Sequence, residues 1–185
     1  MSSGIRNAGN LTLSGQVTVP TFGKFQKTGA GTLTYTFPGA NVLASGDDGG
    51  TFRVDEGAVV LEGGGTQTNQ INGELWLASA QNVPASLTLN NTSLTTTSWL
   101  AMGRGNGSTN TVSTLNISGS TVQTGNFSAG FDADLGGNVS TQNITLANST
   151  WTNNGATLVA ERGGATTNLT LNGTASFTGK GRTEF

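Results

Sequence analysis

The chain has 185 residues and a net charge of −2, and charged residues make up 10% of it, against about a quarter in an average soluble domain. It contains no His and no Cys, which excludes disulfides, a cysteine nucleophile, a Ser-His-Asp triad and His-based zinc sites. No basic block indicates a nucleic-acid partner and no apolar run is long enough to span a bilayer, so we expect neither nucleic-acid binding nor membrane insertion by this segment.

The first third of the chain consists of short strand-like runs separated by glycines. Apolar residues alternate with Thr over residues 11–13 and 17–19, which is the period-2 pattern of half-buried strands. Two longer runs follow at residues 25–36 and 51–61. The spacing of an amphipathic helix is absent throughout, so the sequence predicts an all-β fold.

Residues 24–65 carry a motif with an opening and a closing phrase. Its residues are Lys27, Gly29, Gly31, Thr32, Leu33 and Thr34 at the opening, and Val54, Gly57, Val59 and Leu61 at the close. This passage resembles the passenger-associated repeat of autotransporters and related bacterial surface proteins. The resemblance implies a right-handed parallel β-helix and a location on the bacterial cell surface or outside the cell.

Four copies of one short phrase organise the second half of the chain. They begin at Leu87, Leu115, Ile144 and Leu169, which are 28, 29 and 25 residues apart. Such a period, with two or three short strands per copy, is typical of a β-solenoid. We predict a single right-handed parallel β-helix (β-solenoid) segment over residues 1–185, with roughly seven coils, at about 25 residues per coil. Leu89, Ile117 and Leu146 are expected to point into its core.

Two further sets of residues recur with these phrases. Leu94, Val122 and Trp151 align as additional core positions. We also align Leu100, Phe127 and Leu158, and this alignment brings Arg104 level with Phe131 and Arg162. It predicts an exposed Arg104–Asp132–Arg162 cluster on adjacent coils.

Asp132 and Asp134 are the candidate metal ligands, because they form a D-x-D loop between two of the copies. Such a loop can bind Ca²⁺ or supply a glycosidase carboxylate pair. The alternative is a solvated turn whose exposed ion pairs contribute little to stability. We expect no resident cofactor and keep Ca²⁺ as the alternative at these two residues.

Trp76 and Trp99 are the candidate ligand-binding residues. Both lie next to inward-pointing leucines in alternating runs, so both are expected on the outer surface, where they can stack on a sugar. A lateral interface or a covering loop explains exposed tryptophans equally well. Trp151 is expected in the core.

Threonines on the outer surface raise the separate hypothesis of an ice-binding face. The Thr-x-Thr runs at residues 32–34, 95–97 and 150–152 do not recur on one face coil after coil. This lack of register argues against the hypothesis.

The sequence favours a non-catalytic structural stalk or adhesin passenger segment of a larger bacterial surface or secreted protein. The first residues lack the charged and apolar regions of a signal peptide, and no cap is evident at either end of the rod. We therefore expect stacking with neighbouring coils of a parent protein, or end to end with another copy. The alternatives are a carbohydrate-binding or carbohydrate-active β-helix that engages surface glycans, and a subunit of an extracellular filament.

Overall fold

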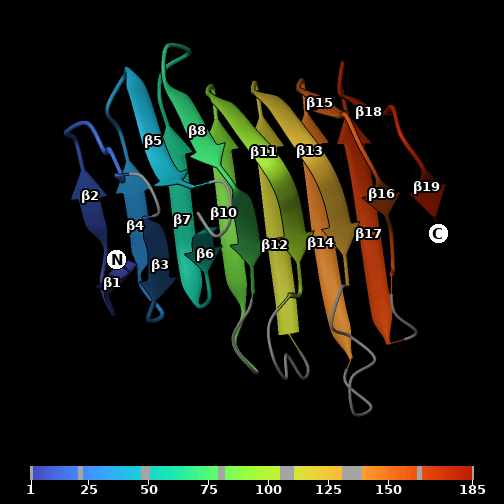
Figure 1. Cartoon of the computed structure of the whole chain (residues 1–185), viewed down its shortest axis with the longest axis horizontal. Helices are drawn as coiled ribbons and strands as arrows, with labels where there is room; N and C mark the ends of the chain where they lie inside the picture. The colour runs from blue at the N-terminus through green and yellow to red at the C-terminus, as the bar shows by residue number, and fades with distance from the viewer. Residues whose placement is uncertain are drawn as a thin grey trace.

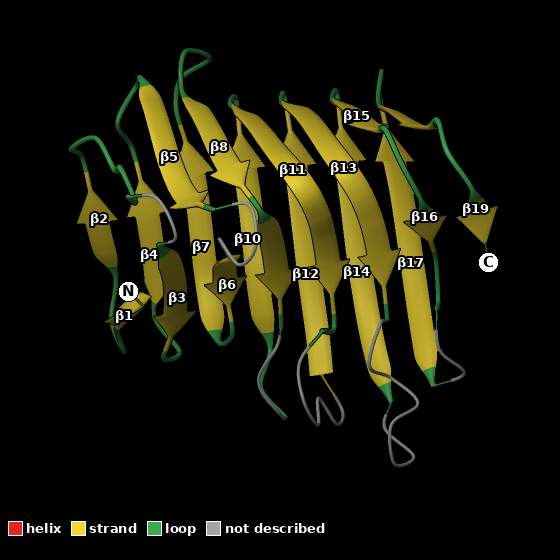
Figure 2. Ribbon diagram, viewed as in Figure 1, coloured by secondary structure: helices red, strands yellow, loops and turns green. Residues whose placement is uncertain are grey.

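The fold was analysed in a computed structural model, which describes residues 2–20, 23–46, 51–78, 82–104, 111–130, 139–161 and 164–184. In these residues the chain is a parallel β-solenoid without helices, as predicted (Figure 2). The coils follow one another along the long axis from the N-terminus to the C-terminus (Figure 1). No helix capable of crossing a bilayer occurs in the described residues.

One side of the solenoid, here called the first face, is a sheet of seven parallel strands in the order β17-β14-β12-β10-β7-β4-β2. These strands are β2 (Leu11–Leu13), β4 (Thr32–Tyr35), β7 (Gly57–Glu62), β10 (Ala85–Asn90), β12 (Thr111–Ser118), β14 (Ser140–Ala147) and β17 (Ala165–Asn172). The four phrases found in the sequence pair in the predicted register, with Leu87 beside Leu115, then Ile144, then Leu169.

The remaining strands form a sheet of twelve strands that bends into two more faces. The second face contains β5 (Ala40–Ser45), β8 (Thr68–Asn72), β15 (Thr150–Asn153) and β18 (Ser176–Gly179). The third face contains β1 (Ser2–Arg6), β3 (Lys24–Thr28), β6 (Thr51–Val54), β9 (Glu74–Leu77), β16 (Thr157–Leu158) and β19 (Thr183–Glu184). The long strands β11 (Ser93–Met102) and β13 (Thr121–Ala129) run through both faces, because β11 pairs first with β8 and then with β9.

The solenoid has about five complete turns, fewer than the roughly seven predicted. The difference lies at the ends. Each of β4, β7, β10, β12 and β14 has a neighbour on both sides, whereas β2 and β17 form the edges of the first face. The predicted number includes these two edge coils, each of which has a paired first-face strand on one side only among the described residues.

The core is a column of inward side chains from all three faces. Leu89, Ile117 and Leu146 are at most 1% exposed, which confirms their predicted direction. Burial of each such side chain stabilises the fold by about 2 kcal/mol. Trp151 is also buried, in register with Leu94 and Val122 as predicted, and its indole N–H donates to Thr124 Oγ1 at 3.0 Å.

The predicted alignment of Leu158 with Phe127 is wrong by one residue. Phe127 pairs with Thr157, whose side chain is buried, and Leu158 pairs with Ser128 on the outer side. The inward position is therefore polar in this coil. Thr157 Oγ1 accepts a hydrogen bond from the buried Asn153 amide, which satisfies both groups.

Gly29 and Gly57, from the motif of residues 24–65, lie at the corner between the third and first faces. Gly29 and Gly57 have φ of +82° and +76°, the left-handed region that glycine adopts at low cost. A Cβ on Gly57 would also lie 2.4 Å from the Gly29 carbonyl oxygen of the preceding coil. A Cβ on Gly31 would lie 2.0 Å from the Gly9 carbonyl oxygen. The Gly-x-Gly spacing is thus required by backbone conformation at Gly29 and by close stacking of the coils at Gly31.

Candidate functional site

Charged and aromatic side chains gather on the outer surface of the third face. Register places Gln26, Arg53, Trp76, Ala101 and Ser128 in one row across five successive coils. Arg53 and Arg104 both lie over the Trp76 ring, with guanidinium carbons 5.2 Å and 4.7 Å from its centre. The two arginines come from the coils on either side of Trp76. We call Arg53, Glu74, Trp76 and Arg104 the arginine–tryptophan cluster.

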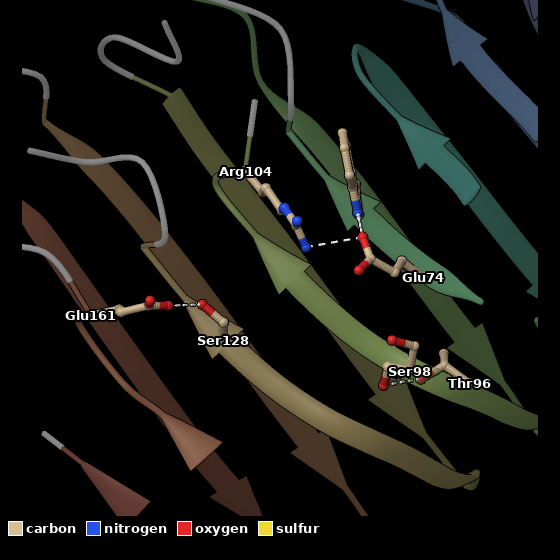
Figure 3. Close-up of polar contacts among 7 residues, drawn as sticks. Glu74, Thr96, Ser98, Arg104, Ser128 and Glu161 are labelled. Atoms are coloured by element: carbon tan, nitrogen blue, oxygen red, sulfur yellow. Dashed lines mark hydrogen bonds and ion pairs between the residues drawn. The ribbon is translucent and has the colours of Figure 1, made fainter. Parts of the chain in front are cut away.

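Carboxylates hold both guanidiniums of this cluster. Arg53 binds the nearly buried Asp55 through two nitrogens, at 3.1 Å and 3.0 Å, and Gln26 donates to the same carboxylate. Arg104 donates to Glu74 Oε2 at 2.9 Å, and the Trp76 indole N–H donates to that oxygen as well. Figure 3 shows Arg104 and Glu74 pointing toward each other. The cluster therefore links β6 and β9 to Arg104, the second residue after β11, across three coils.

This geometry bears on Trp76 and Trp99 as candidate sugar-stacking residues. Trp76 lies on the outer surface as predicted but is half-buried, and the arginines already lie over its ring. Trp99 is half-buried too, and it follows an irregularity in the pairing of β11 with β13. Because Leu100 pairs with Leu75, Trp99 lies beside Glu74 in the register. The two candidates thus belong to neighbouring strands of one face.

Asp132 and Asp134 lie outside the described residues, as does Arg162, so the predicted Ca²⁺ loop is not described. The predicted Arg104–Asp132–Arg162 cluster therefore stays a prediction; among the described residues, Arg104 binds Glu74 and Trp76 of the preceding coil. On the next coil, Ser128 donates a hydrogen bond to Glu161 (Figure 3). Within the described residues, no group of three or more Asp, Glu, His or Cys side chains is arranged to hold a metal ion.

Lys27, from the motif of residues 24–65, has a structural role. Its side chain is fully buried in the column, and its amine donates to the carbonyl oxygens of Thr28, Gly29 and Glu56 at 3.0, 2.5 and 3.1 Å. Burial lowers the pKa of Lys27, and the neighbouring Glu56 carboxylate partly opposes that change. The lysine therefore satisfies the carbonyls of two stacked corners, a structural role.

The outer surface of the first face has a different character. One row of this face contains Thr12, Thr34, Val60, Thr88, Asn116, Thr145 and Thr170 in register. The row beside it contains Thr32, Ala58, Ser86, Thr114, Asn143 and Asn168. Glu62 is the single charged residue in the seven strands of this face. We call these two rows the threonine–asparagine rows.

The Thr-x-Thr runs named in the sequence analysis lack a common register because they lie on different faces of the solenoid. Residues 32–34 lie on the first face, whereas Thr95 and Thr152 lie on the second. The rows appear only when the outward residue of every first-face strand is read across the coils. Their members are about 4.8 Å apart along a row, and the rows are roughly 6.6 Å apart.

The column is open at its C-terminal end. A hollow of about 290 Å³ lies there, with Ile144, Trp151, Leu169 and Phe177 among its lining residues. Leu169 and Leu171 are 49% and 48% exposed although they occupy inward positions of β17. Leu11 of β2, at the other end, is 37% exposed.

Comparison of the chain with protein-family models, with curated proteins and with solved structures finds no match. The parallel strand order itself shows the fold class.

Proposed function

We propose that the chain is a non-catalytic, rigid structural segment of a bacterial surface or secreted protein, serving as a stalk or as part of an adhesin passenger. The observation that carries this proposal is the unbroken seven-strand ladder of the first face, wound around one apolar column. A stack in which each coil contacts its neighbours resists bending and extends in one direction.

The resemblance of residues 24–65 to the passenger-associated repeat supports an autotransporter-type parent protein. Residues of this motif stabilise the corners of the coils. Lys27 donates hydrogen bonds to carbonyl oxygens there, and Gly29 and Gly57 adopt left-handed backbone conformations. Because these residues stabilise the stacking of coils, they support a structural rod as the role of this segment.

A screen against pectins, alginates, glucans and host glycans tests the absence of catalysis. We expect no turnover. Turnover that disappears in Asp132→Asn or Asp134→Asn would overturn the structural proposal. Binding without turnover that is lost in Trp99→Ala would support the adhesin form and the carbohydrate-binding alternative.

A second candidate function rests on the threonine–asparagine rows. Hydroxyl and amide groups held at a fixed repeat in rows without charged residues can order water, as an ice-binding face does. The test is ice-recrystallisation inhibition by the wild-type chain, by Thr88→Lys in the middle of a row, and by Thr152→Lys on the second face. This candidate requires activity in the wild type and in Thr152→Lys but not in Thr88→Lys. An inactive wild type removes it.

A further inference from the structure

The three tryptophans of the chain differ in what their rings and their N–H groups contact. Trp151 lies in the core, and its N–H donates to Thr124. Trp76 lies under both arginines of the arginine–tryptophan cluster, and its N–H donates to a carboxylate. Trp99 is half-buried, and neither its ring nor its N–H has a partner among the described residues. Of the two outward tryptophans, Trp99 is therefore the one that can receive a ligand.

A β-bulge determines where Trp99 lies. The pairing of β11 with β13 shifts just before Trp99, so that residues 97–98 of β11 lie opposite Gly125 alone. A Cβ on Gly125 would lie 2.4 Å from the Thr97 carbonyl oxygen, so the bulge requires glycine at this position. Bulges redirect side chains and are common beside functional sites. This bulge brings Trp99 into register with Asn126 of the following coil.

Trp99 is the middle one of three outward side chains on consecutive coils, which we call the Trp99 row. Glu74 of β9 lies beside it on one side, since Leu100 pairs with Leu75, and Asn126 of β13 lies beside it on the other. All three side chains of the row are half-buried. Neighbouring strands are about 4.8 Å apart, so the row is roughly 10 Å long.

Each end of the Trp99 row has one polar atom with a partner and one without. Glu74 Oε2 accepts hydrogen bonds from Arg104 and Trp76 (Figure 3), whereas Oε1 has no donor among the described residues. Asn126 Oδ1 accepts the Ala156 N–H at 2.9 Å, whereas the Asn126 amide nitrogen has no acceptor in the described chain. The bonded atoms hold both side chains in place. The row thus presents an acceptor, an aromatic ring with its own donor, and a second donor, in that order.

We propose that the Trp99 row binds a neutral glycan with equatorial hydroxyl groups. One pyranose ring stacks on Trp99, and its hydroxyls bond to Glu74 Oε1 and to the Asn126 amide nitrogen. This inference rests on the adhesin form of the proposed function and names the ligand class.

The chemistry of such a sugar matches the row. Equatorial hydroxyls leave the faces of the pyranose ring to apolar C–H groups, which pack on an aromatic ring, and hydroxyls at the ring edge both donate and accept hydrogen bonds. A uronic acid does not match, because the charge in the row is the Glu74 carboxylate, whose Oε1 would repel a second carboxylate.

Titration calorimetry of the full chain with tetrasaccharides tests the proposal. The neutral probes are cellotetraose and xylotetraose, and the matched acidic probe is the cellouronate tetramer, which carries a carboxylate on every sugar. The chain should bind a neutral probe and not the acidic one. Trp99→Ala should weaken binding by about tenfold or more, and Trp99→Phe, which keeps a smaller ring, should weaken it less. Asn126→Asp keeps the acceptor for Ala156 but removes the donor, and it should weaken binding by about tenfold.

Trp76→Phe is the matched control for Trp99→Phe, because it keeps a ring under both arginines and should bind like the wild type. Urea unfolding should show that every variant is folded. A folded wild type that binds neither neutral probe overturns the glycan site and leaves the proposed stalk function standing. Binding that survives both Trp99→Ala and Asn126→Asp, a greater loss in Trp76→Phe than in Trp99→Ala, or tighter binding of the cellouronate overturns the Trp99 row as a site for neutral glycans. Hydrolysis of a probe would instead overturn the non-catalytic function.

Discussion

Leu146 and Leu171 occupy the same column of the first face, on adjacent strands and in direct register. Leu146 is fully buried, whereas Leu171 is 48% exposed. The two residues have the same identity and direction, and they differ only in whether another coil follows. Burial in this fold is therefore supplied by the next coil, so the middle and the ends of one column have different energetics.

The largest expected effect separates these two leucines. Leu146→Asp buries an unpaired carboxylate and should destabilise the fold by more than about 4 kcal/mol, enough to unfold the chain. Leu171→Asp leaves the carboxylate in contact with water and should cost within about 1 kcal/mol. Urea unfolding followed by circular dichroism measures both. Equal losses of stability in Leu146→Asp and Leu171→Asp would contradict the difference between middle and end coils. If Asp were tolerated at Leu89, Ile117 and Leu146 alike, the register of the first-face strands would be wrong.

A second test concerns polar burial near the N-terminal end. Lys27→Met removes the donor of three carbonyl oxygens and should destabilise the chain by about 3 kcal/mol. Lys24→Met on the same strand is the control, because Lys24 is exposed and should change little. An unaffected Lys27→Met protein would show that the lysine is not needed for corner stacking.

Tyr35 offers a smaller change of the opposite sign. Its hydroxyl is buried, and no partner for it is found among the described residues. Tyr35→Phe should therefore raise the free energy of unfolding by about 1 kcal/mol at neutral pH. A decrease on urea unfolding would indicate that the hydroxyl is satisfied.

The pH dependence of that difference sharpens the test. Burial raises the pKa of Tyr35, so the unfolded chain loses the proton first as pH rises. Stability of the wild type is then lost above about pH 10, the ordinary range of tyrosine. The gap between wild type and Tyr35→Phe should widen above that pH. A constant gap would contradict the raised pKa.

Calcium gives the smallest and most local test. If Asp132 and Asp134 bind Ca²⁺, Tm should rise with added Ca²⁺ and fall with chelator, and both changes should vanish in Asp132→Asn/Asp134→Asn. A Tm indifferent to Ca²⁺ would remove this hypothesis. The comparison between middle and end coils would be unaffected.

The sequence was sufficient for the fold class and for the first-face register, because Leu-Thr-Leu phrases alternate strictly and recur at nearly equal spacing. It failed at Leu158, where the inward residue of the coil is Thr157. An alignment by apolar character selects the leucine, and the hydrogen bond that satisfies a buried threonine has no sequence signal.

The arginine–tryptophan cluster was only partly foreseen. Trp76 was identified from alternation, but Arg53 and Arg104 reach it from coils that share no repeated phrase with its own. The contact of these arginines with Trp76 depends on the number of residues in the turns between strands, and composition does not determine that number. The threonine–asparagine rows, by contrast, were present in the sequence and needed only the correct face assignment.

Residue-resolved hydrogen exchange in dilute solution measures whether each coil is stabilised by the coil that follows it. Amides of β10 and β12, in coils covered on both sides, should exchange most slowly, and those of β2 and β17 should exchange fastest among the first-face strands. Slow exchange of β17 equal to that of β12 in dilute solution would contradict the account.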